Sequence, residues 1–392
     1  MRILAMTNLY PNPWQPHRAP FNRHQFRILN ERHPVQVIAP ISWIDERNAR
    51  KVSGPSLGDE RRISLDGLTV EHPRYWFPPK IARSWYGHCF RFSVGKAFRS
   101  AIAQFRPDLI FTPWAYPDGW AAVRMGHAAG LPVVLQCHGS DILLLDQFPS
   151  RRKRTVEAVT AADGVVAVSR DIASHLYRLG ASRERVRVIH DGVDRTRFSP
   201  GSRTEARRRL GWIKVDPMML FVGNLVAVKA VDVLLNAAAE LAGSGQRFDL
   251  VVIGEGSLRS ELEQLAQALG LGDRVTFRGA VPQTDLPMWY RAANLLVLPS
   301  HSEGVPNVLL EASACGTPWV ASRVGGIPEI AHLGVNSLVP PNSPGELAAA
   351  IRTMLKSPAN HPGIAPKPRE DAVAELIEFL EERLRSFPTA AG

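Results

Sequence analysis

Two glutamates, Glu303 and Glu311, stand eight residues apart in the segment "SHSEGVPNVLLEASACGTP". Pro306 between them suits the first turn of a helix, where its missing N–H costs nothing, so we expect a helix over residues 308–315. Free N–H groups at a helix start favour an anion. Glu311 lies about 60° from the buried stripe of this helix, so its carboxylate needs donors, which ligand hydroxyls would supply. The segment predicts a site for a ligand with an anion and hydroxyl groups, although Glu303 could instead only stabilise the helix start.

A histidine and a lysine follow strand-like runs elsewhere. His138 lies in "VVLQCHG", and Lys229 comes shortly after "MMLFVGNL", before a helical pattern. A single histidine is more often structural than catalytic, and a lysine before a helix is usually a solvated surface group, so both interpretations stay open on these residues alone. The chain has no Asp-x-Asp, Walker A or Ser-His-Asp pattern, and in "VIGEGSLRSEL" Arg259 replaces the third glycine of a dinucleotide-binding loop.

The elements that would position these residues follow from the apolar pattern. Strand-like runs such as "RILAMTNL" and "PDLIFTP" lack polar alternation, and the pattern restarts after residue 200 with "MMLFVGNL" and "FDLVVIGEG". Helical patterns separate the runs at residues 23–32, 94–105, 121–130, 171–180, 231–243, 257–270, 286–293 and 308–315. Such alternation indicates parallel sheets buried on both faces.

We therefore predict an α/β protein with two Rossmann-like, doubly wound domains. The expected boundaries are residues 1–200 for the first domain, 201–370 for the second, and 371–392 for a last helix that packs back on the first. Ligands of such sheets bind beyond the carboxyl ends of the strands, so we expect a site in a cleft between the two halves.

Length, composition and charge narrow the class of protein. At 392 residues, with 45% hydrophobic and 21% charged residues, the chain is typical of a soluble globular protein with two domains. The apolar runs are shorter than the ~18 residues that span a bilayer, and three widely spaced cysteines favour a cytoplasmic protein. Residues 1–200 carry 29 Lys and Arg against 17 Asp and Glu, a net of +12, whereas the remainder carries 18 against 20. A basic first half predicts an anionic partner: phosphates, a membrane surface or nucleic acid.

The segment "EGVPNVLLEASACGTPWVASRVGGIPEI" closely resembles the E-x7-E signature of glycosyltransferase family 4, a family of retaining enzymes with the GT-B fold. The resemblance extends over about residues 1–351. It implies that Glu303 binds the donor sugar and that Glu311 binds the ribose hydroxyls of a nucleotide-sugar. The residues between them that would hold sugar hydroxyls and diphosphate are Gly304, Val305, Asn307 and Val308.

The segment "LFVGNLVAVKAVDVLLNA" resembles the loop in which the family holds the diphosphate with an Arg and a Lys. Lys229 matches the family's Lys. Asn224 occupies the position where the family usually has the Arg, and Ala230 replaces a Gly that is usual there. A fixed cation stabilises the charge that develops on the leaving phosphate. More of this role therefore falls on Lys229, and Arg18 is the expected substitute for the missing Arg. The other donor-binding residues that the resemblance implies are Gly223 and Val281.

In the first half, "LQCHGSDI" resembles the family's His-Gly-x-Asp at a strand end, which implies that His138 contacts the donor sugar near the reacting carbon. The loop "YPNPWQPHRAPFNRHQF" resembles one in which a Gly lets the backbone approach the diphosphate and acceptor. Ala19 stands at this Gly, and alanine reaches positive φ only at a cost. We expect Arg18 and Ala19 to face the acceptor side of the site.

Residues 74–99 mix aromatic side chains with six basic residues and one histidine. The basic residues are Arg74, Lys80, Arg83, Arg91, Lys96 and Arg99, and the histidine is His88. Such a mixture suits a membrane interface, where each cation near anionic lipid contributes ~1 kcal/mol; an ordinary helix with a core face and a surface face is the alternative. We expect a peripheral protein at the inner membrane face.

Taken with the resemblance, these features predict a metal-independent retaining glycosyltransferase that uses a UDP- or GDP-linked sugar as a substrate and no cofactor. The expected acceptor is lipid-linked or a polysaccharide precursor, and the expected catalytic residues are His138, Glu303 and Lys229. The resemblance implies same-face attack, with the leaving phosphate accepting the acceptor's proton. The alternatives are a catalytically weakened GT-B protein that binds an anionic polymer or nucleic acid, and a sugar-phosphate synthase of the same fold. The lack of a recognisable nucleic-acid motif counts against nucleic acid.

Overall fold

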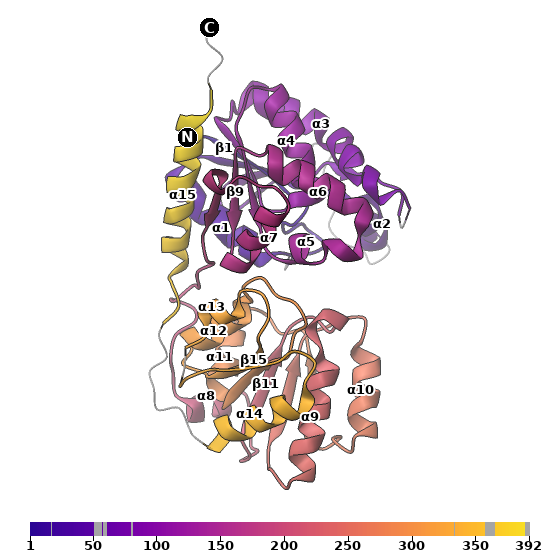
Figure 1. Ribbon diagram of the computed structural model, residues 1–392, viewed down its shortest axis with the longest axis vertical. Coiled ribbons are helices and arrows are strands. Elements are labelled where there is room, and N and C mark those ends of the chain that lie inside the picture. Colours follow the sequence, from indigo (N-terminus) through magenta and orange to yellow (C-terminus); the bar gives the residue numbers. More distant parts are fainter. Residues whose placement is uncertain are drawn as a thin grey trace. The chain divides into compact units, whose positions relative to one another are not determined.

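The computed structural model describes residues 1–16, 18–50, 57, 61–79, 81–332, 334–356 and 365–388. The chain forms two compact units (Figure 1): an N-terminal unit of Met1–His190 with Glu370–Gly392, and a C-terminal unit of Asp191–Arg369. Lys80 of the basic segment and residues 389–392 of the expected last helix lie outside the described residues.

The N-terminal unit is built on an eight-stranded sheet. Its strands are β1 (Ile3–Met6), β2 (Val35–Ile38), β4 (Arg62–Leu65), β5 (Leu68–Glu71), β7 (Leu109–Thr112), β8 (Val133–Cys137), β9 (Gly164–Ala167) and β10 (Val186–Val188). Their spatial order is β10-β9-β8-β7-β1-β2-β5-β4, and all neighbours are parallel except β4 and β5. Two short strands, β3 (Ile41–Ser42) and β6 (Arg74–Tyr75), form a separate parallel pair.

The predicted doubly wound parallel sheet is confirmed, but its strands β4 and β5 were not predicted. The edge strand β4 runs antiparallel to its neighbour β5. The residues of β4 are alternately exposed and half-buried, and β5 includes the exposed Thr69, so both lack the continuous apolar run by which the other six strands were recognised.

Eight α-helices accompany this sheet among the described residues. They are α1 (Pro20–Arg32), α2 (Trp43–Arg50), α3 (Tyr86–Gln104), α4 (Trp120–Ala128), α5 (Ser140–Leu143), α6 (Pro149–Ala161), α7 (Arg170–Arg178) and α15 (Arg369–Ser386), with short turns at η1 (Arg83–Trp85), η2 (Ala115–Gly119), η3 (Leu145–Gln147) and η4 (Arg183–Arg185). The helix α3 begins at Tyr86 and not at residue 94, because its first two turns bury only Gly87 and Phe90 and have weak apolar periodicity. The helix α6 was missed, since "RRKR" fills its first half and its buried residues are few.

Both faces of this sheet are buried. Ile3 and Ala5 of β1 belong to one cluster of buried residues, whereas Leu4 and Met6 belong to another, as expected for a strand whose successive side chains point to opposite faces. The helix α3 contributes Phe90 and Val94 to the second cluster.

The helix α15 packs against the first of these faces (Figure 1). Its Val373, Leu376 and Phe379 share a buried cluster with Phe26 of α1 and Val166 of β9. The helix nearest the end of the chain therefore completes the core of the N-terminal unit.

The C-terminal unit contains a six-stranded parallel sheet. Its strands are β11 (Met218–Val222), β12 (Asp249–Ile253), β13 (Val275–Gly279), β14 (Leu295–Leu298), β15 (Trp319–Ser322) and β16 (Ser337–Val339), in the spatial order β13-β12-β11-β14-β15-β16. Its helices are α8 (Arg203–Arg209), α9 (Val231–Gly243), α10 (Arg259–Ala268), α11 (Leu286–Ala292), α12 (Asn307–Ala314), α13 (Ile327–Ile330) and α14 (Pro344–Lys356), with a turn at η5 (Ala227–Lys229).

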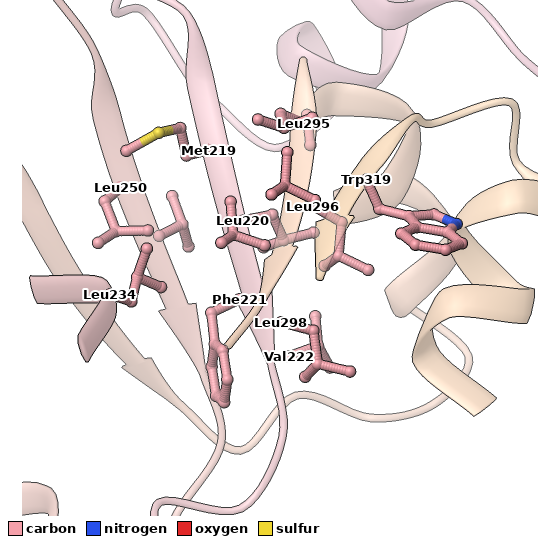
Figure 2. Packing of buried hydrophobic residues seen from close by; sticks show 14 of the residues in the cluster. Met219, Leu220, Phe221, Val222, Leu234, Leu250, Leu295, Leu296, Leu298 and Trp319 are labelled. Carbon is pink, nitrogen blue, oxygen red and sulfur yellow. The ribbon is translucent and has the colours of Figure 1, made fainter. Parts of the chain in front are cut away.

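The core of this unit lies between its strands and the helices that cover them. Figure 2 shows Leu220 of β11 beside Leu296 of β14, with Leu234 of α9 and Trp319 of β15 in the same cluster. Buried Leu, Val and Phe side chains on adjacent parallel strands explain why the apolar pattern predicted these elements well. The helices α9, α11 and α12 lie within one residue of their predicted bounds.

Each sheet has one point from which successive strands extend in opposite directions. This switch point lies between β1 and β7 in the N-terminal sheet and between β11 and β14 in the C-terminal sheet. The loops that follow two such strands turn to opposite faces and leave a crevice at the carboxyl edge, where ligands of doubly wound sheets bind. The sequence places Arg18 after β1, Lys229 after β11 and Glu303 after β14.

Three described alanines have a positive φ, and two of them directly precede an α-helix. Ala19 precedes α1 with φ 44° and ψ 60°, and Ala230 precedes α9 with φ 49° and ψ 44°. At both positions the family that the sequence resembles usually has glycine. Glycine reaches this backbone conformation without strain. A Cβ atom there costs ~1–2 kcal/mol, so the loops keep this geometry at the expense of strain.

Replacing Ala230 by glycine should leave the protein at least as stable, because relief of the strained φ offsets the greater freedom of glycine in the unfolded chain. The matched control is Ala239→Gly in the interior of α9, which should lower the free energy of unfolding by ~1 kcal/mol. Denaturant unfolding of the three proteins measures both effects. Equal losses in the two variants would contradict the strain at Ala230.

Candidate functional site

Lys229 and Glu303 form an ion pair at the carboxyl edge of the C-terminal sheet. The distance between Lys229 Nζ and Glu303 Oε1 is 2.6 Å, and the hydroxyl of Ser300 donates to the same oxygen at 2.7 Å. The N–H of His301 donates to the carbonyl of Val228 at 2.9 Å, which joins the loop after β14 to the loop after β11. The lysine and glutamate side chains remain 22% and 10% exposed, so the pair is screened little by water yet open to a ligand.

The backbone behind Glu303 is tightly packed. The N–H of Gly326 donates to the carbonyl of Gly304 at 2.8 Å. Gly325 has a φ of +54°, and a Cβ atom there would lie 1.7 Å from the carbonyl oxygen of Glu303. Because residues 325 and 326 are glycines, their loop can approach the backbone of Glu303 and Gly304. This contact fixes the path of the main chain at Glu303.

The helix α12 begins at Asn307, shortly after Glu303. Pro306 is its N-cap residue, with an extended backbone of φ −74° and ψ 118°, so the expectation that Pro306 lies within the first turn is wrong. No side chain caps this helix, and the N–H groups of its first turn, at Asn307 and Val308, have no acceptor within the helix. They form a site that favours an anion. Val308 is half-buried and packs against the core of this unit.

Glu311 lies on the buried side of α12, with 5% of its surface exposed. The hydroxyl of Tyr290, in α11, donates to Glu311 Oε2 at 2.8 Å. Burial raises the pKa of the Glu311 carboxyl to about 7, against the opposing effects of the Tyr290 hydroxyl and of Arg369 and Arg197. The carboxylate is therefore only partly ionised at neutral pH before a ligand binds.

Tyr290 was not identified from the sequence. Its hydroxyl reaches Glu311 because α11 packs against α12, whereas the sequence pattern only placed Tyr290 inside the predicted helix 286–293. The burial of Glu311 itself was predicted, since its helical angle lies close to the packed face.

The pH dependence of stability tests the burial of Glu311. A carboxyl whose folded pKa of about 7 exceeds its ordinary value of 4.5 stabilises the fold below pH 4.5, and loses that contribution as the pH rises through 7. Between roughly pH 5 and pH 8, the parent should lose about 2 kcal/mol of unfolding free energy that Glu311→Gln retains. Denaturant unfolding of both proteins at both pH values measures the difference, and parallel behaviour would contradict it.

The other residues predicted to bind the donor lie in or near the same loops. A Cβ atom on Gly254 would lie 1.9 Å from the carbonyl oxygen of Gly223, so the ends of β11 and β12 meet closely here. Asn224 is exposed, Val281 is half-buried and Val305 is buried. In the stretch 223–230, Lys229 is the one charged residue.

His138 follows β8 in the N-terminal unit and is half-buried beside the ring of Phe21, with 4.9 Å between the ring centroids. Its Nε2 atom is buried and has no hydrogen-bond partner among the described residues. Burial lowers the pKa of His138 to about 4, so the ring is neutral at pH 7. Asp141 Oδ1 accepts the N–H groups of His138 and Gly139 at 3.1 and 2.9 Å, which fixes the backbone of this strand end.

Arg18 lines a cavity of about 370 Å³ at the switch point of the N-terminal sheet. Five aromatic side chains form much of its wall: Tyr75, Phe77, Tyr86, Trp114 and Tyr116. Arg18 Nε donates to the carbonyl of Asn8 at 3.0 Å, Nη1 donates to Gln15 Oε1 at 2.9 Å, and Asp45 lies 3.7 Å away. Arg18 is therefore held by oxygens of its own unit, and Asn8 and Asp45 line the same cavity.

A second cation, Arg151 of α6, lines this cavity. Its guanidinium carbon lies 4.7 Å from the ring centroid of Phe148, and no ion pair joins it to any other described residue. The sequence did not identify Arg151 or the aromatic wall, because they come from segments far apart in the chain and α6 itself was missed. The run "RRKR" at residues 151–154 was the available signal.

The structure thus assembles two groups of the predicted residues. Lys229, Glu303 and the start of α12 meet in the C-terminal unit, with Glu311 on the buried side of the same helix. Arg18 and Ala19 lie in the loop before α1 of the N-terminal unit, where Arg18 faces the cavity. In the part of the chain that the structure describes, no group of three or more His, Cys, Asp or Glu is arranged to hold a metal ion.

Two family profiles match the chain. Residues 202–378 match the family described as "Glycosyl transferases group 1", and residues 21–197 match "Glycosyltransferase Family 4". D-inositol 3-phosphate glycosyltransferase 1 of Catenulispora acidiphila is 35% identical over 321 residues, which is 75% of this chain and 74% of that protein. D-inositol 3-phosphate glycosyltransferase 2 of the same organism is 38% identical over 262 residues, but the match spans only 61% of each chain.

The fold is also found among solved structures. Sucrose-phosphate synthase from Thermosynechococcus elongatus superposes with a TM-score of 0.75 and 22% identity, over 98% of this chain and 97% of that one. The prediction of two Rossmann-like domains is confirmed at the level of the fold.

Proposed function

The chain belongs to glycosyltransferase family 4, and on this premise we propose that it transfers a sugar from a nucleotide-sugar to a hydroxyl group of a phosphate-bearing acceptor, with retention at the sugar carbon. The observation that carries the proposal is the Lys229–Glu303 pair, which lies at the switch point of the C-terminal sheet and just before the start of α12. A cation, a carboxylate and free helix N–H groups in one place match a diphosphate joined to a sugar.

Each of these groups has a distinct task in the proposed donor complex. Glu303 accepts hydrogen bonds from hydroxyls of the sugar, and Glu311 accepts them from the ribose. Lys229 and the N–H groups of Asn307 and Val308 bind the diphosphate. Because negative charge grows on the phosphate as the sugar leaves, these fixed donors stabilise the transition state more than the bound substrate.

The proposed reaction needs no protein nucleophile. The acceptor hydroxyl attacks the face of the sugar from which the phosphate departs, and a phosphate oxygen takes its proton. A neutral His138, whose pKa is far below 7, is suited to position the sugar and not to act as a general base at neutral pH.

Donor binding must loosen the Lys229–Glu303 ion pair of the free protein. The diphosphate competes for Lys229, while sugar hydroxyls replace the lysine at Glu303; Ser300 keeps one oxygen of Glu303 occupied. Asn224 adds no charge, so Lys229 is the cation of its loop that this exchange depends on.

The acceptor is proposed to occupy the cavity of the N-terminal unit. About 370 Å³ is enough for a monosaccharide-sized polyol, Arg151 is free to pair with a phosphate, and aromatic rings can cover the apolar face of a sugar ring. The relatives named for D-inositol 3-phosphate favour a soluble polyol phosphate of this kind. The lipid-linked or polysaccharide-precursor acceptor expected from the sequence finds no support in these names, and the acceptor screen below includes it.

Glu303→Ala and Lys229→Ala should each lower the transfer rate by roughly 10²–10³-fold, as expected when a group that stabilises developing charge is removed. Rates are measured with UDP- and GDP-linked sugars, with and without a chelator, which also tests the expected independence of metal. Thermal unfolding checks that each variant is folded. The control is Arg208→Ala, which breaks an exposed ion pair with Glu205 in the same unit and should leave the rate unchanged.

Near-parental rates in either site variant would refute the role of that residue. If the parent binds nucleotide-sugars but transfers to no acceptor and instead retains anionic polymers, the weakened binding protein becomes the better description. Transfer to a sugar phosphate would favour the synthase alternative.

Arg151→Ala should raise the KM for a phosphate-bearing acceptor by roughly tenfold or more, because a charge-assisted contact to phosphate is lost. The KM for the nucleotide-sugar should not change. Arg152→Ala is the matched control, since Arg152 is the next residue of α6 but does not line the cavity. The screen covers D-inositol 3-phosphate, unphosphorylated inositol and lipid-linked sugars; equal use of inositol with and without phosphate would contradict the proposed contact.

A further inference from the structure

Large apolar side chains are exposed mainly in one short region of the described chain. Four of the six with more than half of their surface exposed lie within residues 76–92: Trp76 (51%), Ile81 (67%), Trp85 (63%) and Phe92 (83%). The other two, Ile213 and Val215, lie together in the C-terminal unit. A soluble domain rarely gathers such side chains on its surface without a partner.

Phe92 lies on the outer face of α3 and Trp85 at its start, whereas Trp76 and Ile81 lie in the segment before the helix. At ~100° per residue, a single stripe of the helix contains Trp85, His88, Phe92, Lys96 and Arg99. The opposite stripe is buried in the core and includes Phe90, Val94 and Ala101. The backbone N–H of Trp76 donates to the hydroxyl of Ser93 at 3.0 Å, which fixes Trp76 beside the same helix. We call Trp76, Ile81 and the outer stripe, with the adjacent Arg91, the α3 face.

The charges of the α3 face are all positive. The sequence has no Asp or Glu between Glu71 and Asp108. Arg91, Lys96 and Arg99 are exposed, and no ion pair joins them to any residue that the structure describes. The cations of this face are therefore left for a partner outside the chain.

On the neighbouring helices, Glu157 pairs with both Arg124 and Arg154, so these three residues add a net of one positive charge beside the face. Burial and then the charges of Arg154, Arg124 and Arg91 lower the pKa of His88, which lies in the stripe, against the opposing charge of Glu157. A shallow hollow of about 550 Å³ runs between α3 and α4 and is lined by His88, Arg91, Phe92, Gly95, Phe98, Arg99, Met125, Ala128 and Ala129. Its lining combines apolar side chains with Arg91 and Arg99.

We propose that the α3 face docks the N-terminal unit on an anionic lipid surface. Trp76 and Trp85 suit the level of the lipid headgroups, Phe92 and Ile81 can enter the acyl boundary, and Arg91, Lys96 and Arg99 pair with lipid phosphates. A single-stranded nucleic acid would use the cations and stack on the aromatic rings, but it would leave the aliphatic Ile81 without a partner. Exposed apolar groups ringed by unpaired cations favour the lipid.

The position of the α3 face also relates it to the cavity. Tyr86 lines the cavity, while Trp85, the residue before it, is exposed on the docking face. Both lie at the start of α3, so the α3 face adjoins the wall of the cavity. The docking itself does not depend on the proposed transfer reaction.

Sedimentation with vesicles tests the proposal. The full chain should sediment with phosphatidylcholine vesicles that contain phosphatidylglycerol at low salt, but not with phosphatidylcholine alone. Phe92→Ser and the pair Lys96→Glu with Arg99→Glu should each weaken binding by roughly tenfold or more. The matched control Ile213→Ser removes an equally exposed apolar side chain from the C-terminal unit and should bind like the parent.

Several results would overturn the docking. They are a parent that stays in the supernatant, a Phe92→Ser variant that binds like the parent, or equal losses in Phe92→Ser and Ile213→Ser. Release of the bound parent by single-stranded RNA, with tight binding of that RNA by Phe92→Ser, would assign the face to a polyanion instead. Thermal unfolding confirms that each variant is folded, and vesicles without acceptor or donor keep the result separate from the transfer reaction.

Discussion

The parallel pairing of β11 with β14 is the constraint on which the candidate site depends. Parallel neighbours end at the same edge, and at this switch point the loops after them turn to opposite faces of the sheet. Lys229 and Glu303 come from motifs far apart in the chain, yet their charged atoms lie 2.6 Å apart because each follows one of these strands. The N-terminal sheet has the same arrangement at its switch point between β1 and β7, where the loops enclose an aromatic cavity.

Much of this arrangement was predictable from the sequence, for physical reasons that differ from residue to residue. Strands buried on both faces have continuous apolar runs, and so the sheets and the helix that carries Glu311 were found. The strands β4 and β5 and the basic helix α6 lack such runs and were missed. Tyr290 and Arg151 gain their roles from the packing of separate helices, which no local pattern encodes. Pro306 was misplaced by one position, because proline is tolerated both at the N-cap and in the first turn.

The residues of the candidate site weaken the fold that carries them. Glu311 is buried as an acid whose pKa is about 7, Ala230 holds a positive φ before α9, and Lys229 and Glu303 are largely removed from water. Buried charge and backbone strain persist where the surrounding structure holds them in place, and they are concentrated at functional sites. The stable core of β11, β12 and β14 supplies that support (Figure 2).

The packing of α15 bears on how the protein is made. The ribosome completes Asp191–Arg369 before it adds the residues that fill the last gap in the core of the N-terminal unit. Domains usually fold in the order of synthesis. Here the N-terminal unit, which is synthesised before the C-terminal unit, can complete its core only after the C-terminal unit has been made. Until Leu376 and Phe379 reach their places beside Phe26, one face of the N-terminal sheet stays partly uncovered. The nascent chain would then present a transient apolar surface, the kind of surface that chaperones bind during translation.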